Sequence, residues 1–470
     1  MTDPTTTPGA APAEAPARRT ERLDRPIPPV VVGPRTKGLR LRGETAGDGL
    51  LAGTASLDDG PFGYPLLTLE TTALDHNVAT MAAVLDRAAE AVGKPGSVEI
   101  APHVKTHMSA QIFARQLAGG AWGATVASPA QLRVVRDWGV RRVFLANELT
   151  DPWDAVWVRD DLERDPDAEL WVYVDSVEGV TVLSRAFAGV SPDVAARCGV
   201  LVELGVEGGR TGVRSPARVL DLARAVDLSP LTLLGVAGYE GAVAHGTDEE
   251  SLAQVRAYCE QLRATAERLV TEELVRRDRL VISAGGSAYL DVVLDVLPGA
   301  FPDESPVAGC VPHVVVRSGA YVVHDHGFYG RMDPLSRIPG AEPLHPAATV
   351  VGTVLSVPEP GLALVGIGRR DVPFDIDLPV PLWVRATGPD GNHGPALDLG
   401  GAEVTALNDQ HLFLHLSHHA RDEQGLGIRT LRPGDVVGFG ISHPCTLMDK
   451  WRVAVVMDGE RPVSLVQLDF

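Results

Sequence analysis

The feature that most constrains the fold is a strand-then-helix unit that recurs along residues 64–296. Eight short apolar runs are each followed by a stretch with helical periodicity. The runs lie at 64–70, 98–103, 123–128, 143–148, 170–175, 199–204, 231–241 and 280–286. They are nearly continuous rather than alternating, which is typical of parallel strands covered on both faces. Eight units in about 250 residues is the size of a (β/α)8 barrel. We therefore predict an α/β fold with such a barrel over residues 60–311.

An open, doubly wound sheet is the alternative arrangement of the same units. The first predicted strand is not followed by Gly-x-Gly-x-x-Gly, so the nucleotide-binding version of this alternative has no support.

The segments before and after the barrel have a different texture. Residues 1–25 are rich in Pro, Thr and Ala, which predicts a disordered tail, and residues 26–59 are expected to join the C-terminal β domain. From residue 312 to 470 the chain has short, Val-rich segments punctuated by Gly and Pro. This pattern predicts a smaller, all-β C-terminal domain.

The composition excludes several classes of function. Lys and Arg number 42 against 61 for Asp and Glu, giving a formal net charge of −19, which argues against nucleic acid as the main partner. None of the apolar runs approaches the ~18 residues of a membrane span. The four cysteines show no CxxC spacing, and the N-terminal stretch lacks the apolar core of a signal peptide. We therefore expect a cytoplasmic protein.

The strongest candidate for chemistry is Lys105, in the segment PHVKTH (102–107) after the second predicted strand. Catalytic groups of barrels project from this end of the strands. Lys105 lies between His103 and His107, and apolar walls and neighbouring positive charge both lower the pKa of an amine. These features favour a Schiff-base lysine. The alternative is an ordinary loop lysine.

A turn of small residues, SAGGS (283–287), follows the last predicted strand. Small residues let backbone N–H groups approach an anion, and the last strands of barrels often bind phosphate. The segment VEGGRTG (206–212) lies at the same end of the barrel. A reactive lysine combined with a phosphate site indicates pyridoxal 5′-phosphate (PLP).

These motifs occur together with GYEG (238–241), RSGAY (317–321) and HPC (443–445). In this order they resemble the D-threonine aldolase and D-serine dehydratase (D-serine deaminase) family, fold-type III PLP enzymes related to alanine racemase. The similarity covers about residues 60–470. It implies an alanine-racemase-like barrel with a smaller β domain.

The resemblance also implies roles for individual residues. Lys105 would carry the cofactor, and Arg210 and Tyr239 would face its pyridine ring. The residues expected at the phosphate are Gly285, Gly286, Ser287 and Tyr321. Whether Arg210 or Tyr239 meets the ring nitrogen stays open. The choice matters because a cationic partner leaves the ring a weaker electron sink.

His443 and Cys445 form a candidate metal pair. Side chains at i and i+2 of an extended segment project to one side. Imidazole and thiolate suit Zn²⁺, with Mn²⁺ as the alternative. The family's aldolases often carry a carboxylate as the second ligand, whereas the dehydratases carry the thiolate, so Cys445 favours a dehydratase.

Other polar clusters are interpreted as structural. His324 and His326 flank Asp325 at the end of a β-run, which favours a solvated loop. A further histidine group is expected on the surface, and Trp451 in the core. That group comprises His411, His415, His418 and His419.

The sequence thus predicts a metal-assisted PLP lyase acting on small D-3-hydroxy amino acids. We expect D-serine dehydratase activity, giving a 2-oxo acid and ammonia. The main alternative is a D-threonine aldolase that releases glycine and an aldehyde. Racemisation needs no metal and is disfavoured, as is a non-enzymatic PLP carrier, because such carriers resemble the barrel alone. Related enzymes complete their sites across two subunits, so we expect a homodimer.

Overall fold

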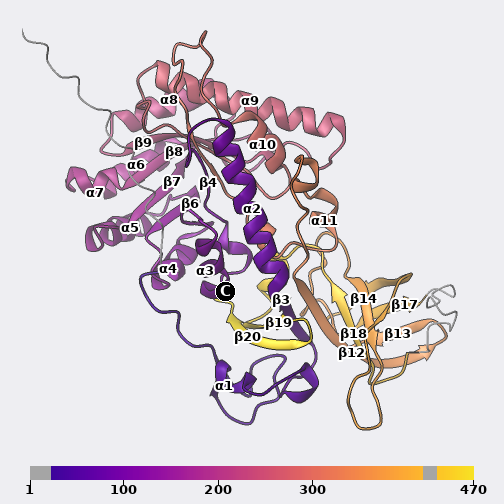
Figure 1. The fold of residues 1–470 in the computed structure, drawn as a ribbon. Coiled ribbons are helices and arrows are strands. Elements are labelled where there is room, and N and C mark those ends of the chain that lie inside the picture. The colour runs from indigo at the N-terminus through magenta and orange to yellow at the C-terminus, as the bar shows by residue number, and fades with distance from the viewer. Residues whose placement is uncertain (1–22, 417–430) are drawn as a thin grey trace, which may run out of the picture.

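A computed structural model of the chain describes residues 23–416 and 431–470. The tail predicted at residues 1–25 therefore falls almost wholly outside the described residues. Figure 1 shows a helix-covered barrel beside a β domain, with the long helix α2 (Thr71–Ala91) running between them. None of the helices in the described ranges is both long and apolar enough to cross a membrane.

The barrel sheet has eight parallel strands in the order β4-β11-β10-β9-β8-β7-β6-β5. They are β4 (Val98–Ile100), β5 (Ala124–Val126), β6 (Arg142–Glu148), β7 (Glu169–Val174), β8 (Cys198–Leu204), β9 (Thr232–Gly238), β10 (Val281–Ala284) and β11 (His313–Val316). The two end strands meet, because the amide of Trp122 donates to the carbonyl of Ile100 at 2.7 Å and that of Thr125 to Pro102 at 2.9 Å. The predicted barrel is confirmed, and the open-sheet alternative is wrong.

Helices connect successive barrel strands and cover the outside of the sheet (Figure 1). They are α3 (Ala110–Ala118), α4 (Pro129–Asp137), α5 (Pro152–Arg164), α6 (Val177–Ala186), α7 (Pro192–Ala196), α8 (Pro216–Asp227), α9 (Glu249–Thr271) and α10 (Leu290–Val296). Most begin at a polar cap: Ser109, for example, accepts a hydrogen bond from the amide of Ile112, and Ser128 from that of Gln131. Such caps satisfy amides that the first helical turn leaves unpaired.

The strand count is as predicted, but its membership is shifted by one strand. The segment 64–70 forms β3 (Leu66–Glu70), which lies in the C-terminal sheet, between β12 (Ala348–Glu359) and β19 (Val453–Asp458). The eighth barrel strand is β11, from the segment predicted to open the β domain. Leu66 to Leu69 are all buried, as expected for a strand covered on both faces. A run of that kind looks the same in either sheet, so its sequence does not reveal which sheet it joins.

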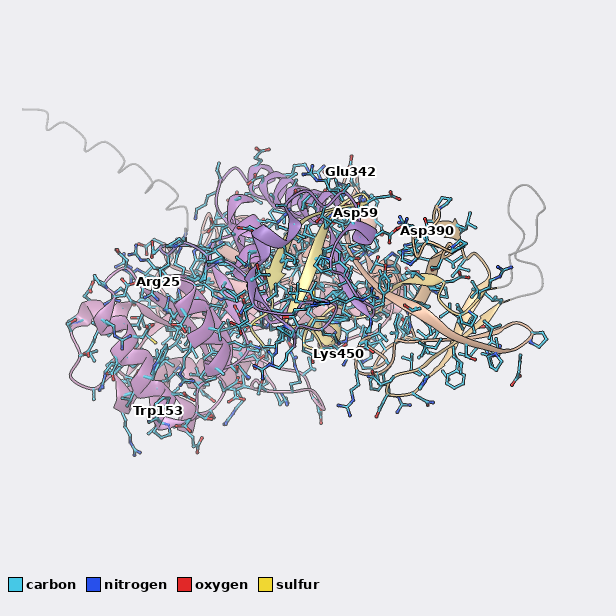
Figure 2. All side chains as sticks on the ribbon, turned by 90° about the horizontal axis from the view of Figure 1, so that it is seen from below. Arg25, Asp59, Trp153, Glu342, Asp390 and Lys450 are labelled. Atoms are coloured by element: carbon cyan, nitrogen blue, oxygen red, sulfur yellow. The ribbon has the colours of Figure 1, made fainter. Side chains whose placement is uncertain are left out.

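Within the described residues, the C-terminal sheet contains ten strands, in the main order β15-β14-β18-β12-β13-β17-β16. Beyond β3, β12 and β19, its strands are β13 (Leu362–Val365), β14 (Val380–Arg385), β15 (Leu397–Asp398), β16 (Ala402–Leu407), β17 (Leu412–Leu416), β18 (Val436–Gly440) and β20 (Arg461–Gln467). β3 pairs antiparallel with β12 and parallel with β19. The N-terminal segment is thus part of the C-terminal sheet. Figure 2 shows the barrel and the β domain side by side from below, with Trp153 at the outer end of the barrel and Asp390 on the β domain.

The remaining elements are short: β1 (Val31–Val32), β2 (Thr45–Ala46), α1 (Gly47–Leu51), α11 (Phe328–Met332) and α12 (Cys445–Met448).

The buried face of α2 carries Leu74, Val78, Met81 and Leu85, whose spacing is that of an apolar stripe along a helix. Trp451 is 1% exposed, so its predicted place in the core is confirmed.

Candidate active site

A cavity of about 340 Å³ lies where the barrel strands end at their carboxyl side. Its wall combines barrel residues with residues from the later part of the chain. The predicted site residues that line it are Lys105, Arg210, Tyr239, Gly286, Ser287, His443 and Cys445. Gly285 and Tyr321 are not among the lining residues.

Lys105 lies in a single 3₁₀ turn, η2 (Val104–Thr106), directly after β4. Burial lowers its pKa from the usual 10.5, and Arg210 and Arg317 lower it further, although Cys445 acts in the opposite direction. A lowered pKa favours the neutral amine, the form that attacks a carbonyl or accepts a proton. The lowered pKa that the sequence argument expected for Lys105 is therefore found, with burial as its main cause.

The positive neighbours of Lys105 are arginines rather than the flanking histidines. Burial lowers the pKa of His103 well below 6.5, with Lys105 and Arg317 acting in the same direction. Burial also lowers the pKa of His107 to about 4, and its ring bonds to Gln116 at 3.2 Å. Both rings are therefore neutral at pH 7.

The glycine turn is held by a carboxylate that the sequence reasoning did not single out. Glu240, which is 0% exposed, accepts hydrogen bonds from the amides of Gly285 at 3.1 Å and Gly286 at 2.5 Å. The two amides expected to bind the phosphate are therefore already paired. Gly286 and Ser287 remain on the cavity wall next to Gly319.

The wall at this turn leaves no room for larger side chains. A Cβ on Gly286 would lie 2.8 Å from Tyr239 Cε2, and one on Gly319 would lie 2.5 Å from the carbonyl oxygen of His103. Ser287 Oγ accepts a hydrogen bond from the amide of Ala320 at 3.2 Å. Small residues from two loops therefore form one narrow recess of the cavity.

Tyr321 has a different position from the one the resemblance implies. Its side chain is 3% exposed, and its hydroxyl accepts a hydrogen bond from Gln116 Nε2 at 3.1 Å, away from the cavity wall. Gln116 also bonds to His107. In this structure Tyr321 supports the packing behind the PHVKTH segment.

Arg210 and Tyr239 lie together, with the Arg210 guanidinium 4.4 Å from the centre of the Tyr239 ring. This is a cation–π arrangement. Burial raises the pKa of Tyr239, and Glu240 raises it further, so the phenol is neutral. Which of the two meets the cofactor's ring nitrogen remains open.

Three further lining residues carry buried polar atoms that have no partner within the described ranges: His103 Nδ1, Tyr173 Oη and Glu203 Oε2. Buried polar atoms are normally hydrogen-bonded, so a cavity lined with unpaired ones is suited to a polar ligand. Together with Lys105 and the glycine recess, they fit a phosphate-bearing aromatic aldehyde such as PLP. Tyr173 and Glu203 could have been recognised in the sequence, because each is a polar residue near the end of an otherwise apolar strand.

The candidate metal pair lies next to the turn that carries Lys105. Cys445 Sγ is 3.3 Å from Thr106 Oγ1. The ring of His443 bonds to Asp375, from Nδ1 to Oδ2 at 2.5 Å, and its backbone amide donates to Asp325 Oδ2 at 2.9 Å. Burial acts to lower the pKa of His443, but Cys445 and Asp375 together raise it to about 9.

Within the described ranges, His, Cys, Asp and Glu side chains do not converge in a group of three or more that could hold a metal. His443 and Cys445 would therefore act as two protein ligands, with the other positions open. Open positions are what a catalytic ion needs.

The prediction of a solvated loop at His324 to His326 is wrong. His324 is 3% and Asp325 is 1% exposed, because the chain passes here between the barrel and the β domain. Besides His443, the Asp325 carboxylate accepts hydrogen bonds from the amides of Gly327, Tyr329 and Gly330. The sequence suggested a solvated loop because it does not show the buried backbone amides that pair with these polar side chains.

The second histidine cluster is described only in part. His411 and His415 are exposed, as predicted. His418 and His419 lie outside the described residues.

Two family models match the chain. Residues 70–292 match "Alanine racemase, N-terminal domain", and residues 347–457 match "Putative serine dehydratase domain". The barrel therefore matches the racemase domain and the β domain matches the dehydratase domain. The resemblance stated from the motifs is confirmed, and the first model accounts for most of the barrel.

Proteins similar to this chain agree with the two domain matches. The chain is 27% identical to a D-threonine aldolase of an Arthrobacter species over 350 residues, which is 74% of this chain and 81% of the relative. The crystal structure of a D-threonine aldolase from Filomicrobium marinum is similar in fold, with a TM-score of 0.67, 22% identity and coverage of 88% of this chain and 96% of that one. A D-threo-3-hydroxyaspartate dehydratase from Delftia sp. HT23 has a TM-score of 0.63 and 20% identity, covering 88% and 99% of the two chains. The prediction of a lyase in this PLP-dependent group is confirmed.

Proposed function

We propose that this protein is a PLP-dependent, metal-assisted lyase of D-3-hydroxy amino acids that acts as a D-serine dehydratase. The reaction converts D-serine into pyruvate and ammonia. One observation carries the proposal: Lys105 from the barrel and His443 and Cys445 from the β domain line the same cavity. The contact between Cys445 Sγ and Thr106 Oγ1 joins the two sides of that cavity.

Lys105 is the residue that would hold PLP and then accept the substrate's α-proton at Nζ. When bound, PLP withdraws electrons from the substrate α-carbon. Burial and two nearby arginines lower the pKa of Lys105, which shifts its titration towards the amine form that can accept this proton. Tyr239, Gly286 and Ser287 form the wall that would orient the cofactor.

His443 and Cys445 are the residues that would hold a divalent metal. An imidazole and a thiolate favour Zn²⁺, with Mn²⁺ as the second candidate. Such an ion supplies Lewis-acid assistance to the departure of the substrate's β-hydroxyl, which is a poor leaving group without it. The thiolate at Cys445, where the aldolases often have a carboxylate, supports dehydration.

D-threonine aldolase activity is the second candidate, supported by the similarity to the Arthrobacter enzyme. The same cavity would then cleave the bond between the α- and β-carbons and release glycine and an aldehyde. The Delftia relative acts on D-threo-3-hydroxyaspartate, which makes this amino acid a third substrate to test. A homodimer and a cytoplasmic location stay predictions.

Product analysis with pure D-amino acids tests the proposal. The protein, loaded with PLP and Zn²⁺ or Mn²⁺, is incubated with D-serine, D-threonine and D-threo-3-hydroxyaspartate. We expect a 2-oxo acid and ammonia from D-serine. Glycine and an aldehyde from D-threonine, without any 2-oxo acid, would establish the aldolase instead. Formation of the L-isomer alone, or no turnover of any of the three, would contradict a lyase.

A further inference from the structure

The carboxylate of Asp375 contacts the ring of His443. It belongs to the loop between β13 and β14 and is not among the residues that line the cavity. One of its oxygens, Oδ2, lies 2.5 Å from His443 Nδ1. The other, Oδ1, accepts a hydrogen bond from Thr446 Oγ1 at 2.7 Å. Both oxygens of Asp375 are thus hydrogen-bonded to the segment that carries His443 and Cys445.

This contact determines which ring nitrogen of His443 can bind an ion. An ionised carboxylate only accepts hydrogen bonds, so Nδ1 must carry the proton in the pair with Asp375. When a metal displaces the second proton of the ring, the lone pair that becomes available therefore lies on Nε2. Histidine ligands of metals commonly show this arrangement, in which the other ring nitrogen donates to a carboxylate.

The backbone of His443 is held as firmly as its ring. Its φ angle is +95°, in a region that residues other than glycine rarely adopt. The amide of His443 donates to the Asp325 carboxylate, which also accepts from three amides at the start of α11. Such a conformation persists only where surrounding contacts fix it, and it is frequent at functional sites. Asp325 therefore fixes the main chain, and Asp375 fixes the ring.

We propose that Asp375 is a positioning residue that sets the tautomer and direction of His443, so that Nε2 and Cys445 bind a divalent cation at the cavity. The inference rests on the proposed role of His443 and Cys445 as metal ligands. A carboxylate in this role contributes 10–100-fold to metal affinity as an order of magnitude. Asp375 does not touch the substrate in this account.

Metal affinity tests the inference without relying on turnover. Zn²⁺ and Co²⁺ are titrated calorimetrically into the metal-free, PLP-loaded protein and its Asp375→Asn variant, with a chelator as competitor. The matched control is Asp377→Asn, because Asp377 pairs with Arg331 and Ser442 at 2.7 Å each rather than with His443. We expect about 10–100-fold weaker metal binding in Asp375→Asn, unchanged binding in Asp377→Asn, and equal PLP affinity in all three proteins.

A spectroscopic readout separates positioning from a general loss of structure. In the zinc-loaded protein labelled with ¹⁵N-histidine, the His443 signals, assigned with a His443→Gln variant, should show a coordinated Nε2 and a protonated Nδ1. Coordination through Nδ1, or wild-type metal affinity in Asp375→Asn, would overturn the inference and leave the proposed function intact. Absence of metal binding by the wild-type protein would overturn the metal role in the proposed function, and the inference with it.

Discussion

At the scale of single residues, the chemistry of the site depends on neighbours that are distant in sequence. Lys105 was recognisable from its place after a barrel strand. Of the arginines that lower its pKa, Arg210 lies in the loop after β8 and Arg317 directly follows β11. The Asp375 contact with His443 joins residues that lie 68 positions apart. A motif can indicate a candidate reactive side chain, whereas its electrostatic surroundings can be described only once the fold is known.

Lys105 should be the residue that binds PLP covalently. Borohydride reduction of the PLP-loaded protein, followed by peptide mass spectrometry, should place the cofactor on the peptide that contains Lys105. The Lys105→Ala variant should lose the absorption band of the lysine-bound cofactor. Lys94→Ala is the control, because Lys94 bonds to the carbonyl of Val311 outside the cavity and its loss should change nothing. A label on another lysine would show the assignment to be wrong.

Replacing Arg210 should change the titration of Lys105. Removing a cation from beside the ammonium form stabilises that form, so Arg210→Gln should raise the pKa of Lys105 towards 10.5. The free amine would then appear only at higher pH. Acetylation of Lys105 in the cofactor-free protein, measured against pH by mass spectrometry, gives this pKa.

The control for the Arg210 experiment is Arg218→Gln. Arg218 is exposed in the first turn of α8 and does not line the cavity. A pKa that is unchanged in Arg210→Gln, or equally raised in the control, would contradict the account of Lys105.

At the scale of elements, the glycine turn shows what a motif leaves out. The sequence placed SAGGS after the last predicted barrel strand. In the structure the turn follows β10, the last barrel strand but one, and part of it lies on the cavity wall. Its small residues suggested free amides, yet the amides of Gly285 and Gly286 are bound by Glu240, which comes from the neighbouring GYEG segment. That a carboxylate from one loop occupies the amides of another becomes visible only when the structure places the two loops together.

The Glu240 carboxylate should be important for stability. In Glu240→Gln, one acceptor is replaced by a donor that faces a buried amide, which leaves at least one N–H unpaired. We expect the free energy of unfolding to fall by about 1–3 kcal/mol, the cost of an unsatisfied buried group. Urea denaturation of the cofactor-free proteins measures this change. Glu207→Gln, at an exposed position, should show no comparable change; equal stability of the two variants would refute the role of Glu240.

At the scale of the whole molecule, the chain crosses between its domains more often than its sequence suggests. The fold class and the number of barrel strands followed from the recurring strand–helix pattern. The sheets to which β3 and β11 belong could not be predicted in this way, because the sequence of a strand buried on both faces does not indicate which sheet it joins. β3 completes the C-terminal sheet between β12 and β19, so the first and last parts of the chain fold as one unit.

A chain that begins at residue 71 should therefore lose the order of its C-terminal sheet. Without β3, the backbone groups of β12 and β19 that face it would lack partners. Hydrogen-exchange mass spectrometry should show loss of protection in both strands. A chain that begins at residue 23 keeps all of β3 and should be protected as fully as the intact protein. Equal protection in the two truncated chains would contradict this topology.

The central claim is that a metal held by the β domain and a cofactor held by the barrel act on one substrate. The most direct measurement is turnover of D-serine after metal removal, with the PLP absorption band recorded on the same sample. Chelation, or Cys445→Ala, should leave that band intact while pyruvate formation collapses, and added Zn²⁺ or Mn²⁺ should restore only the chelated wild type. Cys310→Ala is the control, since Cys310 bonds to the Arg277 carbonyl far from the cavity wall. Full pyruvate formation by protein shown to be metal-free by elemental analysis would contradict the account.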